Sequence, residues 1–283
     1  MENVHLLVDS CCDLSREDLA QMHASVAPLS ITIDSKVYVD DGSIDIVPYL
    51  NAMKASRNPV RSACPSPEKY MSEMLNADGD CFVVTLSSQL SGSYNAAMLG
   101  REMALEVDPS RRIHVFDSKS ACAGETHLAL FVSELLNAKH SFDEIIELAN
   151  EKIATMHTLF VLESLDNLVK NGRVSKTVAT IANVLSIRPV MSNDGHGGIR
   201  MASKGRGIRG ALTQMVNLVH KHTEQFADHS RRLTLSYCNC LERAESVRDM
   251  IREKCPAIGE ISMHHTSGLS TMYAYDGGVV VGF

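Results

Sequence analysis

The stretch CFVVTLSSQLSGSY, residues 81–94, joins a strand pattern directly to the start of a helix. Cys81–Leu86 is an apolar run broken only by one threonine, which is typical of a buried strand. Ser91-Gly92-Ser93 then lies at a predicted helix start, where free backbone N–H groups and the helix dipole favour an anion. No lysine or arginine lies nearby in sequence, so a single carboxylate or phosphate monoester fits better than a triphosphate.

The same alternation of strand and helix patterns extends over the first half of the chain. Short apolar runs predict further strands at Val4–Val8, Val26–Ile33, Lys36–Val39 and Ile113–Phe116. Capping signals such as Ser66-Pro67-Glu68 begin helices between them. This alternation predicts an α/β fold with a parallel or mostly parallel sheet covered by helices on both faces.

Polar pairs follow three of these predicted strands, namely Asp9-Ser10, Ser87-Ser88 and Asp117-Ser118. In open parallel sheets, ligands bind in the crevice at the carboxyl ends of the strands. Serine and aspartate at strand ends can also act only as turn formers and helix caps, which is the alternative interpretation. Because three such pairs coincide, the sequence indicates a polar crevice at one edge of the sheet.

The second half of the chain predicts a second, smaller α/β domain. A turn-rich stretch at Asn193–Gly198 separates two strand-like runs and predicts a hairpin. Further strands are predicted at Leu233–Tyr237, Glu260–Met263 and Val279–Phe283. We expect a boundary near residue 157, which gives an N-terminal domain over 1–157 and a C-terminal domain over 158–283.

Composition excludes several classes of function. The 283 residues carry 27 lysines and arginines against 34 acids, a formal charge of −7, which argues against a general affinity for nucleic acid. No apolar run approaches the ~18–20 residues of a membrane helix. The first apolar run begins too close to the initiator methionine for a signal peptide, so we expect a cytoplasmic protein. The eight cysteines form no C-x-x-C pair, and the twelve histidines show no H-E-x-x-H signature, so no metal is predicted.

Three other motifs allow chemical interpretations. Ser66–Lys69 matches S-x-x-K, but the companion motifs of that enzyme class are absent and a helix cap explains the serine. Gly205–Gly210 matches the dinucleotide pattern G-x-G-x-x-G, but the strand after its helix ends without an acid to hold a ribose. His264-His265 follows a predicted strand, where an imidazole can donate to an anion or act as a general acid–base group. A histidine without a function is the alternative there.

Several segments together resemble the DegV family of bacterial fatty-acid-binding proteins. They occur in family order across essentially the whole chain, and Ser87–Tyr94, which fits S-S-x-L-S-G-[TS]-Y, is the most specific. The other matching segments are Asp9-Ser10 with Asp13-Leu14, Ser62–Ser66, Asp117-Ser118, Leu165–Ser175, Ile187–Val190, Asp194-Gly195, Lys204–Arg206 and His265-Thr266. The chain departs from the family pattern at Ala63, where T-S-x-P-S loses its second hydroxyl, and at Ser267–Leu269, which replaces G-P-G.

The resemblance implies two α/β domains that enclose an apolar tunnel, with the carboxylate of one long-chain fatty acid held between the domains. Ser62 corresponds to the family residue that binds this carboxylate. Ser91, Gly92 and Ser93 correspond to a second oxygen-binding loop. His265 corresponds to the histidine that faces the head group, although the adjacent His264 leaves open which imidazole does so.

The resemblance also implies partners. FakB-type members of the family present the carboxylate to a separate ATP-dependent fatty acid kinase, which makes an acyl phosphate for phospholipid synthesis. Arg173, Lys204 and Arg206 correspond to basic positions near the tunnel mouth and are candidates for docking the kinase. The implied protein is a lipid-binding carrier without catalytic residues or a cofactor of its own. A membrane surface, contacted transiently, is a further candidate partner.

An enzyme is the alternative function. A Ser/His-dependent hydrolase or phosphotransferase acting on a small carboxylate or ester would use His265 and a serine of the predicted crevice. The sequence contains no G-x-S-x-G elbow, and no acid can be assigned to orient the histidine.

Overall fold

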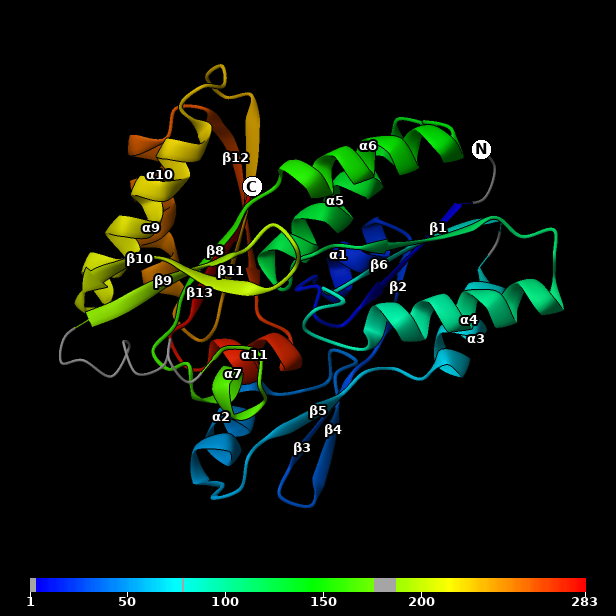
Figure 1. Ribbon diagram of the computed structural model, residues 1–283, viewed down its shortest axis with the longest axis horizontal. Coiled ribbons are helices and arrows are strands. Elements are labelled where there is room, and N and C mark those ends of the chain that lie inside the picture. Colours follow the sequence, from blue (N-terminus) through cyan, green and yellow to red (C-terminus); the bar gives the residue numbers. More distant parts are fainter. Residues whose placement is uncertain (1–3, 78, 176–186) are drawn as a thin grey trace.

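The computed structural model describes residues 4–77, 79–175 and 187–283, and within these ranges the strands form three sheets (Figure 1). The first sheet is parallel throughout, in the order β2-β1-β6-β7. Its strands are β1 (Val4–Asp9), β2 (Ala24–Ala27), β6 (Asp80–Thr85) and β7 (Ile113–Asp117). The parallel sheet predicted from the first half of the sequence is confirmed.

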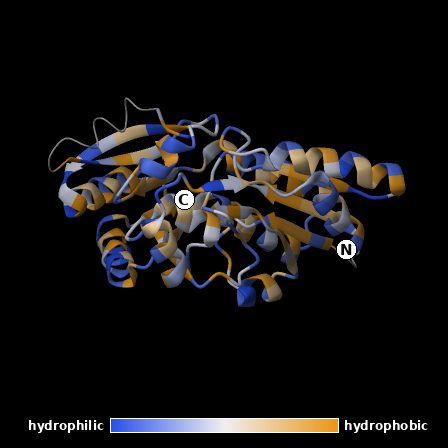
Figure 2. Ribbon diagram, turned by 90° about the horizontal axis from the view of Figure 1, so that it is seen from below, coloured by the Kyte–Doolittle hydropathy of each residue, from blue (hydrophilic) through white to orange (hydrophobic). Residues whose placement is uncertain are grey.

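Helices cover both faces of this sheet because successive strand residues point to opposite sides. Leu7 on β1 packs in one buried cluster with residues of α3 (Pro67–Asn76) and α4 (Ser93–Val107). Leu6 and Val8 pack in another with α5 (Ala123–Asn137) and α6 (Phe142–Thr155). The short helix α1 (Arg16–Gln21) adds Leu19 to the second cluster. Figure 2 shows the apolar strands of this sheet between their flanking helices.

The single strand predicted over Val26–Ile33 is wrong, because the structure divides this run between two sheets. β2 ends at Ala27, and β3 (Ser30–Ile33) pairs with β4 (Lys36–Val39) and β5 (Arg61–Ala63) in a small antiparallel sheet. Pro28 separates the two strands; it lacks the N–H that a continuous ladder requires. Helix α2 (Ile46–Ala55) follows β4.

The second half of the chain forms a mixed six-stranded sheet, in the order β10-β9-β8-β13-β11-β12. The pairing is antiparallel except between β11 and β12. The strands are β8 (Thr158–Val161), β9 (Ile187–Asn193), β10 (Ile199–Arg206), β11 (Arg231–Tyr237), β12 (Ile258–His265) and β13 (Val279–Gly282). The predicted hairpin is β9–β10, so the second sheet expected from the sequence is confirmed.

Two amphipathic helices, α9 (Gly207–Thr223) and α10 (Leu241–Lys254), bury their apolar sides against this second sheet. The short helices α7 (Asp166–Lys170) and α11 (Gly268–Ala274) contribute to a separate core cluster, which also includes residues of β3, α2 and β8. This fourth cluster draws residues from both halves of the chain and surrounds the pocket described below.

Helix α5 connects the two large sheets. It covers one face of the parallel sheet and also contacts β11 and β13 of the mixed sheet. A Cβ atom on Gly282 of β13 would lie 2.7 Å from the Ala123 carbonyl oxygen, so only a glycine allows this approach of strand and helix. The domain boundary near residue 157 stays a prediction. Helix α5, which precedes this residue in the chain, packs against both the parallel sheet and the mixed sheet.

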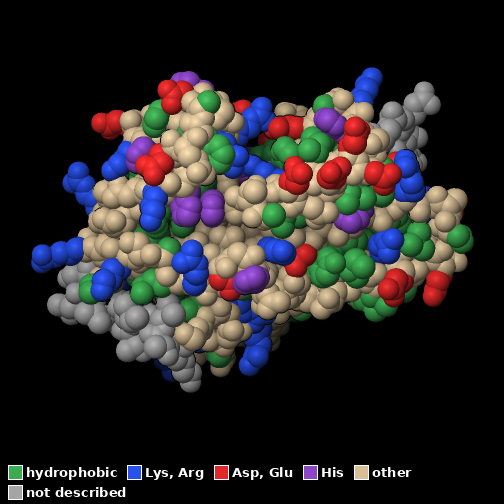
Figure 3. Space-filling model, turned by 45° about the horizontal axis from the view of Figure 1, so that its top comes forward, with side chains coloured by type: hydrophobic (Ala, Val, Ile, Leu, Met, Phe, Trp, Pro, Cys, Tyr) green, Lys and Arg blue, Asp and Glu red, His purple; other side chains and the backbone are tan. Residues whose placement is uncertain are grey.

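Among the described residues, none of the helices combines the length and the apolar character needed to cross a bilayer. On the face shown in Figure 3, basic and acidic side chains are interspersed.

Candidate functional site

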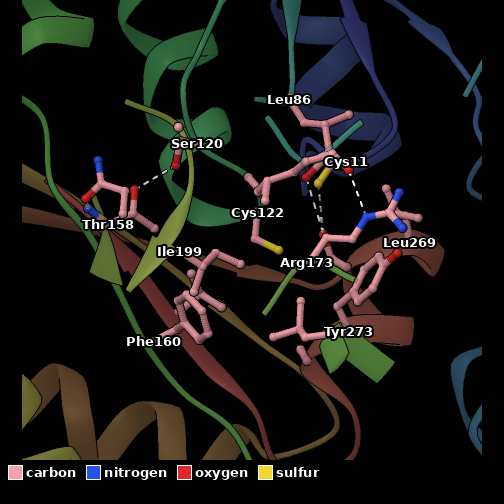
Figure 4. A pocket seen from close by; sticks show the side chains of 18 of the residues that line it. Cys11, Leu86, Ser120, Cys122, Thr158, Phe160, Arg173, Ile199, Leu269 and Tyr273 are labelled. Atoms are coloured by element: carbon pink, nitrogen blue, oxygen red, sulfur yellow. Dashed lines mark hydrogen bonds between the residues drawn. The ribbon is translucent and has the colours of Figure 1, made fainter. Parts of the chain in front are cut away.

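An apolar pocket lies between the two halves of the chain (Figure 4). The space between its walls is about 730 Å³ when open solvent at its mouth is included. The loops after β1, β6 and β7 supply Cys11, Leu86 and Ala121 to one wall. The mixed sheet and α11 supply the facing wall, which includes Phe160, Ile199, Val280, Leu269 and Tyr273.

The charged side chains that line this pocket, among the described residues, are both basic. They are Lys119, in the loop after β7, and Arg173, in the loop after α7. Arg173 is half-buried, and its Nε donates to the Leu90 carbonyl oxygen at 3.0 Å. Its terminal nitrogen also donates to the Asn171 carbonyl oxygen. A pocket with apolar walls and only cationic charges favours a ligand that is largely apolar and carries a negative group.

A second polar region lies on the opposite side of the view in Figure 4. The hydroxyl groups of Ser120 and Thr158 lie 2.6 Å apart and share one hydrogen bond. The side chain of Asn193 accepts the Thr158 backbone N–H at 3.1 Å. These polar atoms are therefore largely paired within the protein, and unlike the guanidinium on the other side they carry no charge.

The predicted serines lie close to the Arg173 side of the pocket, although none of them is part of its lining. Ser62, on β5, has its hydroxyl 3.4 Å from the hydroxyl of Tyr273, which does line the pocket. A Cβ atom on Gly92 would lie 3.2 Å from the Cys64 sulfur, so the two predicted loops are neighbours. The structure therefore brings Ser62 and the Ser91–Ser93 loop together.

The Ser91–Ser93 loop is held by its own hydroxyl groups. The Ser91 Oγ accepts the Ser93 backbone N–H at 3.2 Å and lies 3.2 Å from the Ser93 hydroxyl. Ser93 is fully buried at the first position of α4, whereas Ser91 is half-buried and Gly92 is exposed. Of the three, Ser91 and Gly92 are accessible to a ligand in this conformation.

Asp9 fixes the loops on which this site is built. Its carboxylate accepts the backbone N–H of Cys11 and that of Leu86, both at 2.9 Å. Burial raises the pKa of Asp9 to about 6, partly opposed by these two hydrogen bonds. Burial also raises the pKa of the neighbouring Glu125 well above its ordinary value, and the nearby charge of Asp9 adds to this shift. The polar pair predicted after the first strand thus has a structural role beneath the site.

His265 lies apart from the serines. It is exposed, and its ring centroid lies 4.3 Å from that of Tyr237 with the two rings tilted by 46°. It lines a separate polar hollow that includes Asp13 and Asp18. Its neighbour His264 is largely buried, with Nδ1 3.5 Å from the Asp18 carboxylate. Burial lowers the pKa of His264, and Asp18 partly opposes this shift. Within the described ranges, no contact joins His265 to a serine of the pocket region, so a Ser–His pair is not formed there.

The three basic residues predicted to dock a partner separate into two groups. Lys204 and Arg206 are exposed on β10, which is an edge strand of the mixed sheet. Arg173 instead lies on the pocket wall with its side chain bonded to backbone carbonyls. In the part of the chain that the structure describes, no group of three or more His, Cys, Asp or Glu side chains is arranged to hold a metal ion.

Sequence patterns missed most of the pocket wall. Tyr273, Phe160 and Ile199 come from distant segments, and nothing in their local sequence indicates a common cavity. Lys119 had an available signal, because it directly follows the Asp117-Ser118 pair at the end of a predicted strand.

Two sheets with an apolar pocket between them define an α/β protein of the small-molecule-binding class. Comparison with known proteins gives the family. The model of the family described as "Uncharacterised protein, DegV family" matches residues 3–283, and the chain belongs to the DegV family.

Relatives in this family include proteins with bound lipids. The chain is 33% identical over 281 residues to a DegV domain-containing protein of Streptococcus pneumoniae strain R6, covering 98% of each chain. It is 37% identical to a DegV family protein of Ruminococcus gnavus whose structure contains vaccenic acid, with a TM-score of 0.92 and 99% of each chain covered. It is 32% identical to the Streptococcus pneumoniae fatty acid kinase B3 protein loaded with linoleic acid, with a TM-score of 0.90 and 99% of each chain covered.

Proposed function

We propose that this protein binds one long-chain fatty acid in the apolar pocket and presents the carboxylate to an ATP-dependent fatty acid kinase. The observation that carries the proposal is the lining of the pocket. Among the described residues, its charged side chains are the two cations Lys119 and Arg173. The vaccenic acid and linoleic acid in the two related structures support the same ligand class.

The tail and the head group of a fatty acid contribute differently to the free energy of binding. Burying an alkyl chain gains roughly 0.8 kcal/mol per methylene, so fourteen methylenes gain on the order of 11 kcal/mol before ordering costs. Desolvating an ionised carboxylate costs several kcal/mol unless donors replace water. Charge-assisted hydrogen bonds return about 1.5–3 kcal/mol each. The tail therefore provides affinity, and a few donors at one end set the orientation.

We place the carboxylate on the side of the pocket where Arg173 and Tyr273 lie. Ser62 supports this placement through its contact with Tyr273, and Ser91 and Gly92 support it through the Leu90 carbonyl that Arg173 holds. Ser93 supports the loop from its buried position. His265 stays a prediction from the family resemblance, because it lines a different hollow.

The kinase partnership rests on the resemblance and on the name of the Streptococcus pneumoniae relative. Lys204 and Arg206 are suited to docking an acidic surface, because both are exposed on an edge strand. Reversing both charges to Glu should lower acyl phosphate formation with a fatty acid kinase while bound lipid stays unchanged. Lys221→Glu, an exposed lysine near the end of α9, is the matched control. An equal rate in the double variant would remove these residues from the docking surface.

The test of the ligand is denaturing organic extraction of the purified protein, followed by mass spectrometry of the released lipid. A near-stoichiometric fatty acid supports the proposal and identifies the tail in the same measurement. A protein that contains no lipid and fails to bind added fatty acids overturns it.

A further inference from the structure

Strand β4 (Lys36–Val39) forms an open edge of the small antiparallel sheet. The strand order is β4-β3-β5, so among the described residues β4 pairs with β3 alone. Figure 1 shows the β3–β4 hairpin projecting at the bottom of the molecule, away from the two large sheets. A groove lined by all four residues of β4 borders the strand, so its free side is accessible. An unpaired strand edge is a template for a strand from another chain.

The hydrogen-bond ladder identifies the free backbone groups of β4. Directly after the strand, the Asp40 N–H donates to the Leu29 carbonyl oxygen at 2.9 Å. In an antiparallel ladder, residues that exchange hydrogen bonds with the partner strand alternate with residues that do not. Counting back from Asp40, Tyr38 also faces β3, and the N–H and C=O groups of Val37 and Val39 point outward.

The side chains of the same two valines are exposed. Val37 is 59% exposed and Val39 is 48% exposed. Tyr38 lies on the opposite face of the sheet, where its ring centroid is 5.2 Å from that of Tyr49. Only seven large apolar side chains are exposed among the described residues, and these two are neighbours on one strand. Valine is a strong strand former, so the outward-facing positions favour pairing.

We propose that β4 pairs with β4 of a second copy of this chain, antiparallel and about a two-fold axis at Tyr38. A two-fold interface uses the same patch on both copies. Because outward-facing residues must pair with each other, this register places Val37 opposite Val39 of the second copy, and the reverse. It also places Lys36 opposite Asp40 of the second copy, so that unlike charges face each other.

The two neighbouring registers match the side chains less well. An axis at Val37 brings Asp34 next to Asp40 of the second copy, and like charges opposite each other are destabilising. An axis at Val39 places Val37 opposite Asp41, an exposed acid. The axis at Tyr38 is therefore the one that matches apolar with apolar and basic with acidic side chains.

The pairing joins two three-stranded sheets into one sheet of six strands with β5 at both ends. Ser62, on β5, lies at the edge opposite β4, so the proposed carboxylate site stays outside the new interface. The paired strands contribute four residues each, which is small beside the ~1,200–2,000 Å² buried in stable complexes. We therefore expect a weak dimer that forms at high protein concentration, whatever the identity of the ligand.

The test is sedimentation equilibrium of the full chain at concentrations up to about 1 mM, where a weak dimer is populated. We expect a reversible equilibrium between monomer and dimer. Replacing Val37 and Val39 together by lysine should raise the dissociation constant at least tenfold, because the introduced charges of the two copies repel each other. Lys36→Glu should also raise it, because the new side chain faces Asp40 of the second copy. Val107→Lys, at an exposed valine on α4, is the matched control and should leave the equilibrium unchanged.

Amide hydrogen exchange, followed by NMR, measures the strand pairing itself. The outward-facing N–H groups of Val37 and Val39 should exchange several-fold more slowly as the protein concentration rises. The Tyr38 N–H, which faces β3, should be protected at every concentration. In the double lysine variant, exchange at positions 37 and 39 should no longer depend on concentration.

Three results overturn the proposal. One is a wild-type protein that stays monomeric over the whole concentration range. If the double lysine variant then also lowers acyl phosphate formation with a fatty acid kinase, the β4 edge belongs to the kinase instead. The second is a dimer whose dissociation constant is the same in the double lysine variant. The third is a dimer that Val107→Lys weakens as much as the double variant does.

Discussion

Arg173 Nε donates to the carbonyl oxygen of Leu90 at 3.0 Å, and both residues line the apolar pocket. This bond ties the loop after α7, which belongs to the second half of the chain, to the loop between β6 and α4. The second loop continues into Ser91–Ser93, where the carboxylate is proposed to bind. One guanidinium therefore both positions this loop and supplies positive charge to the pocket.

Replacing Arg173 by alanine should reduce stability and ligand affinity together. The variant loses hydrogen bonds to two backbone carbonyls, and each such bond is worth about 0.5–1.5 kcal/mol. We expect the free energy of unfolding in urea to fall by about 1–3 kcal/mol and the affinity for oleic acid to fall at least tenfold. Arg209→Ala, an exposed arginine on α9, is the control and should stay within about 0.5 kcal/mol. Unchanged affinity for oleic acid in Arg173→Ala would show that the Arg173 charge does not contribute to ligand binding.

Filling the pocket should shorten the bound acyl chain. Ala121 lines the wall after β7, and a phenylalanine there takes up space that a long tail needs. We expect mass spectrometry of extracted lipid from Ala121→Phe to show shorter chains than the wild type, with less lipid per protein. Ala96→Phe provides the comparison, because Ala96 is half-buried on α4 and is not part of the pocket lining. If Ala121→Phe gave the same chain-length distribution as Ala96→Phe, the acyl tail would not lie against Ala121.

Gly282→Ala should destabilise the contact between the mixed sheet and α5. The added Cβ would lie 2.7 Å from the Ala123 carbonyl oxygen and from the Gly124 Cα, and these backbone atoms cannot move aside cheaply. Overpacking of this kind costs about 1–3 kcal/mol, measurable by chemical denaturation. Gly210→Ala, on α9, is the control, because the nearest atom to its added Cβ would be the Gly205 carbonyl carbon at 3.6 Å, and it should stabilise by about 0.4–1 kcal/mol. A loss of stability in Gly210→Ala similar to that in Gly282→Ala would contradict the packing argument.

Local sequence signals predicted the elements well where one segment carries all the information. Ser66 accepts the Lys69 backbone N–H as the cap of α3, as the Ser66-Pro67-Glu68 signal predicted. The Val26–Ile33 run, which divides into β2 and β3, depended on Pro28. The effect of this proline on strand pairing becomes visible only when the neighbours of each strand are known. Sheet order likewise depends on contacts between distant segments, which propensity does not encode.

The candidate site was predictable only in part for the same reason. Ser91–Ser93 and Ser62 could be named from motifs, and the structure brings their loops together. The wall that faces the ligand comes from distant segments, so Tyr273 had no local signal. Arg173 was expected at a docking surface, whereas its neighbours Leu90 and Asn171 hold it at the pocket. Whether it also meets a partner stays a prediction.

Asp13 should make stability depend on pH in a direction opposite to that of a carboxylate whose pKa is lowered in the folded protein. It is buried beside Ser267, whose backbone N–H it accepts at 2.8 Å, and desolvation raises its pKa to about 6. Between about pH 4 and 6 the folded protein thus holds a proton that the unfolded chain has released. The contribution of Asp13 to stability is therefore lost as the pH rises through this window.

Asp13→Asn removes this titration and keeps an oxygen that can accept the Ser267 N–H. We expect urea denaturation to give similar stabilities for variant and wild type near pH 4, with the variant gaining up to about 3 kcal/mol relative to the wild type by pH 7.5, at roughly 1.4 kcal/mol per pKa unit. Asp41→Asn should show the reverse trend, because hydrogen bonds from Ser43 lower the pKa of Asp41, and the wild type gains from that charge as the pH rises. A difference between Asp13→Asn and wild type that stays constant from pH 4 to 7.5 would show that the Asp13 carboxyl has an ordinary pKa in the folded protein.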